Sequence, residues 1–130
     1  MTDHQFIAEL EACTLSPGRF HHADHVHAAW IYLSRYPPLE AIGRFCNSLR
    51  NFAASMGKPD RYHETITWAY LLIVNERMQC RGVGENWDAF AAANPDLLDW
   101  ENPILHRYYR KETLDSALAR RTFLMPDATK

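Results

Sequence analysis

Histidine is the residue type in this sequence that is best suited to chemistry. The chain has 7 histidines in 130 residues, and four of them fall within FHHADHVHAAW, residues 20–30. Imidazole nitrogens bind transition metals and exchange protons near neutral pH. The question that decides their role is which of these side chains point into the protein.

A helical projection of residues 22–36 separates these four histidines, because each residue turns the helix by about 100°. The apolar side of this helix carries Val26, Ala29, Trp30, Leu33 and Tyr36. His22 falls in the middle of that side. His25 lies on the same side one turn further on, so the two imidazoles converge as an i, i+3 pair. We expect His21 at the edge of this face and His27 on the solvent side.

His63 also points inward in the helix predicted over residues 61–79. It shares a face with Thr67, Tyr70 and Val74. Buried imidazoles are costly unless each nitrogen has a partner, and a divalent metal ion satisfies several of them at once. We therefore predict that His22, His25 and His63 bind one divalent transition-metal ion, namely zinc, iron or copper.

Each histidine has an alternative role. An inward imidazole is often hydrogen-bonded to a backbone carbonyl within the core. His21 could replace His22 as a ligand, because His21 and His25 form the i, i+4 pair found in zinc metalloproteases, although the H-E-x-x-H string is absent. His4 and His106 are expected on the surface, with His106 a reserve ligand.

Two neighbours of His63 are candidate catalytic residues. Glu64 could be a fourth ligand, a carboxylate that orients an imidazole, a general base, or a first-turn acid favoured by the helix dipole. Tyr62 could line a substrate pocket together with Trp68 and Tyr70, although aromatic residues at helical spacing usually belong to the core.

The periodicity predicts an all-α protein, a compact helix bundle with one domain over residues 1–130. The four main helices are expected at residues 3–14, 22–36, 38–56 and 61–79, and shorter pieces at 85–93, 97–100, 103–109 and 114–123. Proline and glycine clusters at residues 16–18, 37–38 and 57–59 separate them. We find no period-2 alternation that would indicate a half-buried strand.

Composition narrows the possible partners. The formal charge is −2, with 14 basic and 16 acidic residues and no basic run, which argues against nucleic-acid binding. No stretch approaches the ~20 apolar residues of a membrane span, and the N-terminal residues lack a signal-peptide pattern. We therefore expect a cytoplasmic protein that does not associate with a membrane. The partners predicted are a small-molecule substrate and a possible second copy. We expect Trp87, Trp100, Tyr108 and Tyr109 to be exposed, and a homodimer could form through them.

Three segments follow one another along the chain: FHHADHVHAAWIYL, RYHETIT and SALARRTFLMPD. They resemble the patterns H-x-x-H-[LV], Y-H-E-T-[IL]-T and S-x-x-A-R-x-x-F-x-x-P-D of a family of small, poorly characterised, mostly bacterial helical proteins. The resemblance covers about residues 20 to 127. It implies a helical fold with a metal site, and its first two motifs select the same His22, His25 and His63.

The resemblance also adds residues near the C-terminus. It implies that Arg121, Pro126 and Asp127 fold back over the site, although a docking segment is an equal alternative. Ala53 departs from the family pattern, which has asparagine there, so the substrate pocket is expected to differ from that of the relatives.

These observations predict a mononuclear metal-dependent enzyme with an open coordination position. With zinc, which lowers the pKa of a water ligand to about 7, Glu64 could accept its proton in a hydrolysis or hydration. Iron or copper would suit oxygen chemistry. The alternatives are a non-catalytic metal-binding or sensing module, and a metal-free helical protein that binds a small ligand or a partner.

Overall fold

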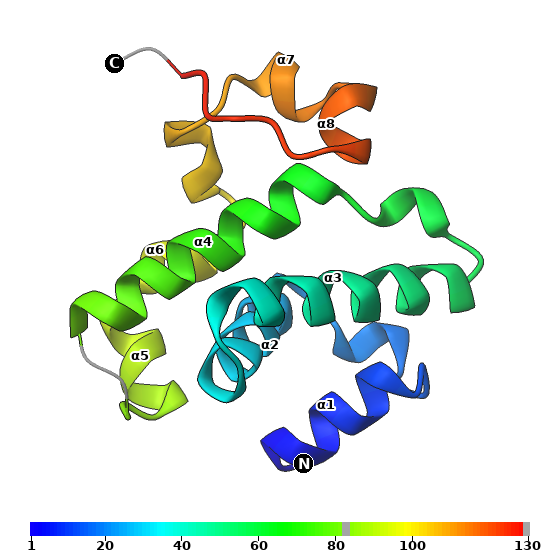
Figure 1. Ribbon diagram of the computed structural model, residues 1–130, viewed down its shortest axis with the longest axis vertical. Coiled ribbons are helices and arrows are strands. Elements are labelled where there is room, and N and C mark those ends of the chain that lie inside the picture. The colour runs from blue at the N-terminus through cyan, green and yellow to red at the C-terminus, as the bar shows by residue number, and fades with distance from the viewer. Residues whose placement is uncertain (82–83, 129–130) are drawn as a thin grey trace. The chain divides into compact units, whose positions relative to one another are not determined.

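The fold is all-α, as the sequence predicts (Figure 1). The computed structural model describes residues 1–81 and 84–128, and no strand occurs within these ranges. The chain forms two compact units, Met1–Tyr62 and His63–Lys130. The prediction of one domain therefore stays a prediction.

The first unit has three helices connected by short turns. They are α1 (Asp3–Glu11), α2 (His22–Arg35) and α3 (Pro38–Ser55), with single 3-10 turns at Pro17–Arg19 and Pro59–Arg61. Helix α3 packs on both α1 and α2. The apolar side chains at helical spacing are buried, among them Phe6, Leu10, Val26, Ile31, Phe45 and Phe52. Their burial provides the main driving force for this unit.

Local signals set the ends of these helices. The Thr2 side chain accepts a hydrogen bond from the Gln5 amide and caps α1. Pro38 begins α3 at a position where proline removes no helical hydrogen bond. Gly57 follows α3 with a φ of 71°, a left-handed conformation that glycine adopts without strain.

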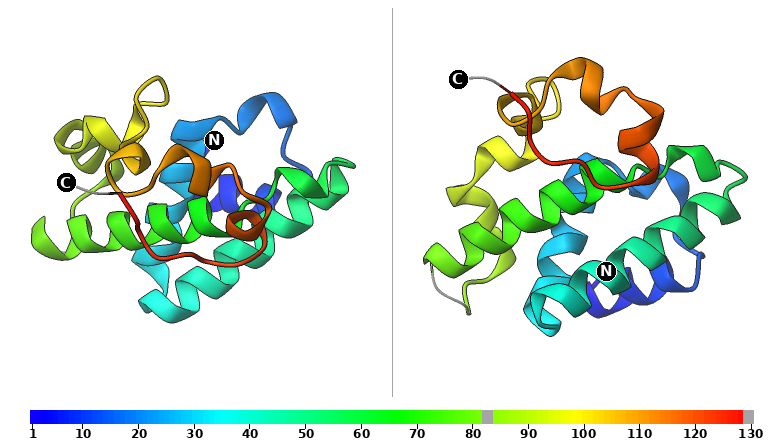
Figure 2. Two further views of the ribbon diagram at one scale, coloured as in Figure 1. Left: turned by 90° about the horizontal axis from the view of Figure 1, so that it is seen from above. Right: turned by 45° about the horizontal axis from the view of Figure 1, so that its top comes forward.

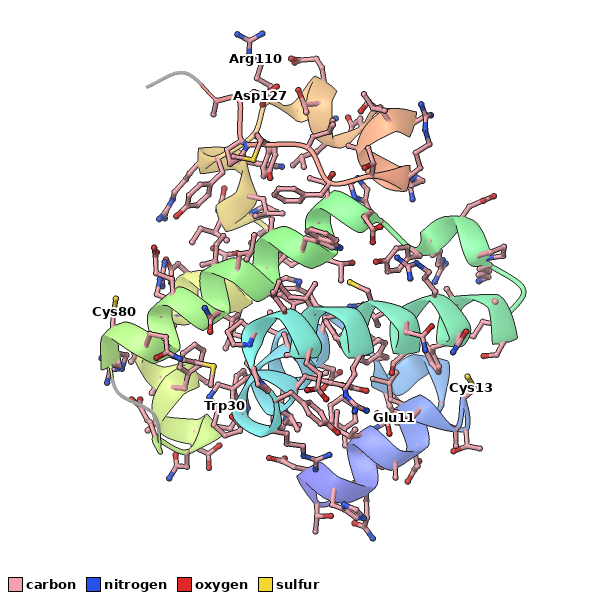
Figure 3. The ribbon with its side chains drawn as sticks, viewed as in Figure 1. Glu11, Cys13, Trp30, Cys80, Arg110 and Asp127 are labelled. Atoms are coloured by element: carbon pink, nitrogen blue, oxygen red, sulfur yellow. The ribbon has the colours of Figure 1, made fainter. Side chains whose placement is uncertain are left out.

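A buried tyrosine joins the three helices of the first unit. The Tyr32 hydroxyl on α2 donates to the Glu11 carboxylate of α1 at 2.7 Å. The same oxygen lies 2.9 Å from the Ser48 hydroxyl of α3, which therefore donates to it. Figure 3 shows Glu11 extending from the end of α1.

The second unit is built around one long helix. It contains α4 (Glu64–Arg81), α5 (Trp87–Ala93), α6 (Pro95–Leu98), a 3-10 turn at Ile104–Arg107, α7 (Lys111–Leu114) and α8 (Ala117–Arg121). Residues 122–128 are extended, and Figure 2 shows this segment running back from α8 past α4. The Arg77 guanidinium on α4 holds α6 through a bidentate ion pair with Asp96 at 2.9 Å.

The predicted boundaries of α2 and α3 agree with the structure to within one residue, whereas α1 ends at Glu11 rather than at residue 14. Several boundaries in the second unit differ, and two of them have a clear local cause. The helix predicted from residue 61 begins at Glu64, because residues 59–61 form a separate 3-10 turn. The helix predicted over residues 114–123 is shorter in the structure, α8 at Ala117–Arg121, because Leu114 ends α7 and Ser116 caps a new helix. In the described part of the chain, no helix combines the length and apolar character needed to cross a membrane.

Candidate functional site

His22 and His25 lie in the first turn and a half of α2. The His25 ring stacks on Phe20, with centroids 4.0 Å apart and planes 22° apart, and Phe20 in turn meets Phe52 of α3 edge-on. Burial, followed by the nearby charge of His22, lowers the pKa of His25 to about 4. His25 is therefore neutral at physiological pH, which is the form that binds metals.

The other two histidines of this cluster support the helix. His21 precedes α2, and its amide donates to the Asp24 carboxylate at 2.9 Å. The prediction that His27 points to solvent is wrong. Its Nε2 atom lies 3.1 Å from the Asp3 carboxylate, and its ring stacks on Phe6 at 5.7 Å, so His27 packs against α1.

His63 is buried in the second unit, and both of its ring nitrogens have partners there. Nδ1 accepts a hydrogen bond from the Ile66 amide at 3.1 Å, so His63 caps the N-terminus of α4. The proton of the neutral ring is then on Nε2, which donates to the carbonyl oxygen of Leu114 at 2.7 Å. Burial lowers the pKa of His63, and the bond to Leu114 opposes that effect.

Glu64 and Tyr62, the two predicted catalytic residues, contact different partners. The Glu64 carboxylate accepts a hydrogen bond from the Trp68 indole nitrogen at 3.1 Å, one helical turn further on. The Tyr62 ring lies below the guanidinium of Arg50, 5.0 Å from the ring centroid. Tyr62 belongs to the first unit and Glu64 to the second.

Sequence reasoning missed the role of Thr65. This side chain is fully buried, and its hydroxyl donates to the Thr122 carbonyl at 2.8 Å. It also accepts a hydrogen bond from the Leu124 amide at 3.1 Å. Phe123, between these two residues, stacks on Trp68 with centroids 5.3 Å apart. Thr65 and Trp68 thus hold the extended C-terminal segment against α4.

Asp127 fixes the far end of this segment. Its carboxylate accepts hydrogen bonds from the Arg110 amide and the Thr113 hydroxyl, and its own amide donates to the Tyr108 carbonyl. Figure 3 shows Asp127 beside Arg110. The docking-segment alternative accounts for these contacts. Arg121 and Pro126, which the resemblance placed over the site, are exposed.

Two of the aromatic residues considered for a homodimer are exposed, namely Trp100 and Tyr108. Trp87 is half-buried and stacks on Phe90. The prediction that Tyr109 is exposed is wrong, because only 2% of its surface is accessible and its hydroxyl donates to the Leu124 carbonyl at 2.7 Å.

The predicted metal ligands belong to both units, with His22 and His25 in the first and His63 in the second. Over residues 1–81 and 84–128, neither unit by itself contains a group of three or more His, Cys, Asp or Glu side chains arranged to hold a metal ion. Glu64 lies next to His63 in sequence, but its carboxylate accepts a hydrogen bond from Trp68.

Comparisons with known proteins do not assign the chain to a family. No family model matches the sequence, and neither the curated proteins nor the solved structures contain a significant match.

Proposed function

We propose that this protein binds one divalent transition-metal ion through His22 and His25 and uses it in a reaction on a small molecule. The observation that carries the proposal is the placement of His22 and His25 one turn apart on α2, close enough for the charge of His22 to lower the pKa of His25. A metal ion competes with protons for the imidazole lone pair, and a ring that is already neutral gives up no proton on binding. The i, i+3 spacing presents both imidazoles from one face of α2.

The sequence prediction names His63 as the third ligand. His63 makes one hydrogen bond with the Ile66 amide and one with the Leu114 carbonyl. To bind a metal ion, it must break one of these two hydrogen bonds. Three imidazoles leave an open coordination position on zinc, which is the arrangement of catalytic rather than structural sites. Such an ion would acidify a water ligand, and Glu64 is the carboxylate proposed to accept the proton.

The second candidate is a metal-free helical protein that binds a small ligand or a partner. The hydrogen bonds of His63 favour it, because both ring nitrogens are satisfied by backbone groups without a metal. In this case His63 is a structural residue that caps α4.

Cobalt titration of the untagged, metal-free protein tests these alternatives. Co²⁺ is a spectroscopic probe for zinc sites, and we expect visible absorption bands that saturate at one equivalent. His22→Ala and His25→Ala should each weaken Co²⁺ binding at least about tenfold, because even the loss of a residue that only orients a ligand costs about 10–100-fold in metal affinity. His106→Ala is the matched control, because His106 is exposed and lies outside the pair.

His63→Ala separates the two candidates. A folded His63→Ala protein that loses Co²⁺ binding supports the three-histidine site. If this variant binds Co²⁺ as well as the unmodified protein does, His63 is not a ligand. If the unmodified protein binds no Co²⁺, Zn²⁺, Fe²⁺ or Cu²⁺, the metal proposal is refuted and the metal-free candidate stands.

A further inference from the structure

Two residues at the start of α4 are tied to the C-terminal part of the second unit. His63 donates to the Leu114 carbonyl, and Thr65 hydrogen-bonds to Thr122 and Leu124. Between them, Glu64 is held by Trp68. Of the residues that flank Glu64, His63 thus holds α7 and Thr65 holds the chain's last described segment.

Trp68 connects the C-terminal segment to Glu64. One face of its indole stacks on Phe123, with the two planes 19° apart, while its Nε1–H donates to the Glu64 carboxylate. A stacked indole has fewer accessible rotamers, so the stacking favours the orientation in which Nε1–H points at Glu64. Removal of Phe123 would allow the indole to turn and would weaken its hydrogen bond to the Glu64 carboxylate.

We propose that residues 122–128 act as a strap that fixes the Glu64 carboxylate through Phe123 and Trp68. Docking of the strap supports the hydrogen bond between Trp68 and Glu64, and release of the strap loosens that hydrogen bond. Trp68 and Phe123 are therefore positioning residues for Glu64. This inference concerns the second unit alone and does not depend on metal binding by His22 and His25.

The geometry of the strap supports such a device. Its hydrogen bonds occur at both ends, at Thr65 for residues 122–124 and around Asp127 for residues 127–128. Asp127 and Met125 are exposed, so this part of the strap runs over the surface. Release of the strap would uncover the buried side chains of Thr65 and of Tyr109, whose hydroxyl donates to the Leu124 carbonyl. Local opening of such segments costs less than global unfolding.

Hydrogen exchange of the Trp68 indole proton in the full-length protein tests the strap. Trp68→Phe assigns the indole signal among the 4 tryptophans. Phe123→Ala should accelerate exchange of the Trp68 Nε1–H by about tenfold, because the indole is no longer held against Glu64. The amides of Leu71 and Val74, in the middle of α4, should change by less than about twofold, which separates local release from global destabilisation.

Three further variants complete the experiment. Phe123→Tyr keeps the stacked ring and should restore the unmodified exchange rate. Leu118→Ala, which removes an exposed apolar side chain on neighbouring α8, should leave that rate unchanged. Asp127→Ala loosens the strap at its far end and should accelerate indole exchange even if Phe123→Ala does not fold.

The proposal is overturned by either of two results. In the first, the indole proton exchanges at the unmodified rate in the Asp127→Ala protein and in any folded Phe123→Ala protein. In the second, it accelerates only in parallel with the Leu71 and Val74 amides.

Discussion

The Nε2 atom of His63 lies 2.7 Å from the carbonyl oxygen of Leu114, a residue 51 positions further along the chain. The other ring nitrogen of His63 accepts the Ile66 amide at the start of α4. One buried imidazole therefore caps a long helix and attaches the short helix α7 to it. Both interactions are satisfied by the neutral ring, whose pKa is lowered by burial.

His63→Ala should destabilise the second unit by about 2–4 kcal/mol, because it leaves the Ile66 amide and the Leu114 carbonyl without partners. Urea unfolding followed by circular dichroism measures this change. His63→Asn should be intermediate, since asparagine caps helices but is too short to reach Leu114. His106→Ala should change stability by less than about 0.5 kcal/mol. Equal losses for His63→Ala and His106→Ala would contradict this assignment.

Stability should fall as the pH drops from about 6.5 to about 4. In this range the unfolded chain binds a proton at His25, whose ordinary pKa is 6.5, whereas the folded protein does so only near pH 4. Protons therefore favour the unfolded state, by up to about 3 kcal/mol from His25 alone. The lowered pKa of His63 acts in the same direction.

His25→Gln tests the source of this pH dependence, because glutamine does not titrate. Urea midpoints at pH 7 and pH 4.5 should differ less in the His25→Gln protein than in the unmodified protein. A difference of the same size in both proteins would show that His25 is not responsible. His106→Gln, which changes an exposed histidine, is the matched control.

Tyr32→Phe should destabilise the first unit by about 1–2 kcal/mol. The substitution removes one hydroxyl that donates to Glu11 and accepts from Ser48, and Ser48 is buried. Tyr36→Phe is the control, because it keeps the ring that the Arg44 guanidinium contacts at 4.3 Å. Thermal unfolding of the two variants should show a lower midpoint for Tyr32→Phe. Equal midpoints would mean that the hydroxyl of Tyr32 does not join the helices.

The helices of the first unit could be predicted from the sequence because strong local signals bound them. Pro37 and Pro38 end α2 and begin α3, and Gly57 follows α3 with a positive φ. The sequence pattern predicts a start of α4 three residues before the observed one, because the residue that caps this helix is His63. Histidine is not among the residues that usually mark a helix start, so propensity alone does not reveal it.

The candidate site could be predicted only where local periodicity determines it. The shared face of His22 and His25 follows from the helical repeat. The contacts of His63 and Thr65 do not, because their partners at residues 114–124 are more than 50 positions away. The motif SALARRTFLMPD did contain a signal, since Ser116 is a typical cap residue and Phe123 and Asp127 are the residues that dock the segment.

Thr65→Val should cost about 1–3 kcal/mol although it preserves the shape of the side chain. Valine cannot donate to the Thr122 carbonyl or accept from the Leu124 amide, and position 65 is fully buried. Thr67→Val is the matched control on the same helix. It removes one hydrogen bond to the His63 carbonyl, which still accepts the Thr67 amide.

Hydrogen exchange of the Leu124 amide distinguishes these two threonine variants. In Thr65→Val this amide loses its acceptor and should exchange about tenfold faster or more. In Thr67→Val its exchange should stay close to that of the unmodified protein, because the hydrogen bond between Thr65 and Leu124 is intact. Comparable acceleration in both variants would mean that α4 as a whole, rather than the Thr65 hydroxyl, holds the C-terminal segment.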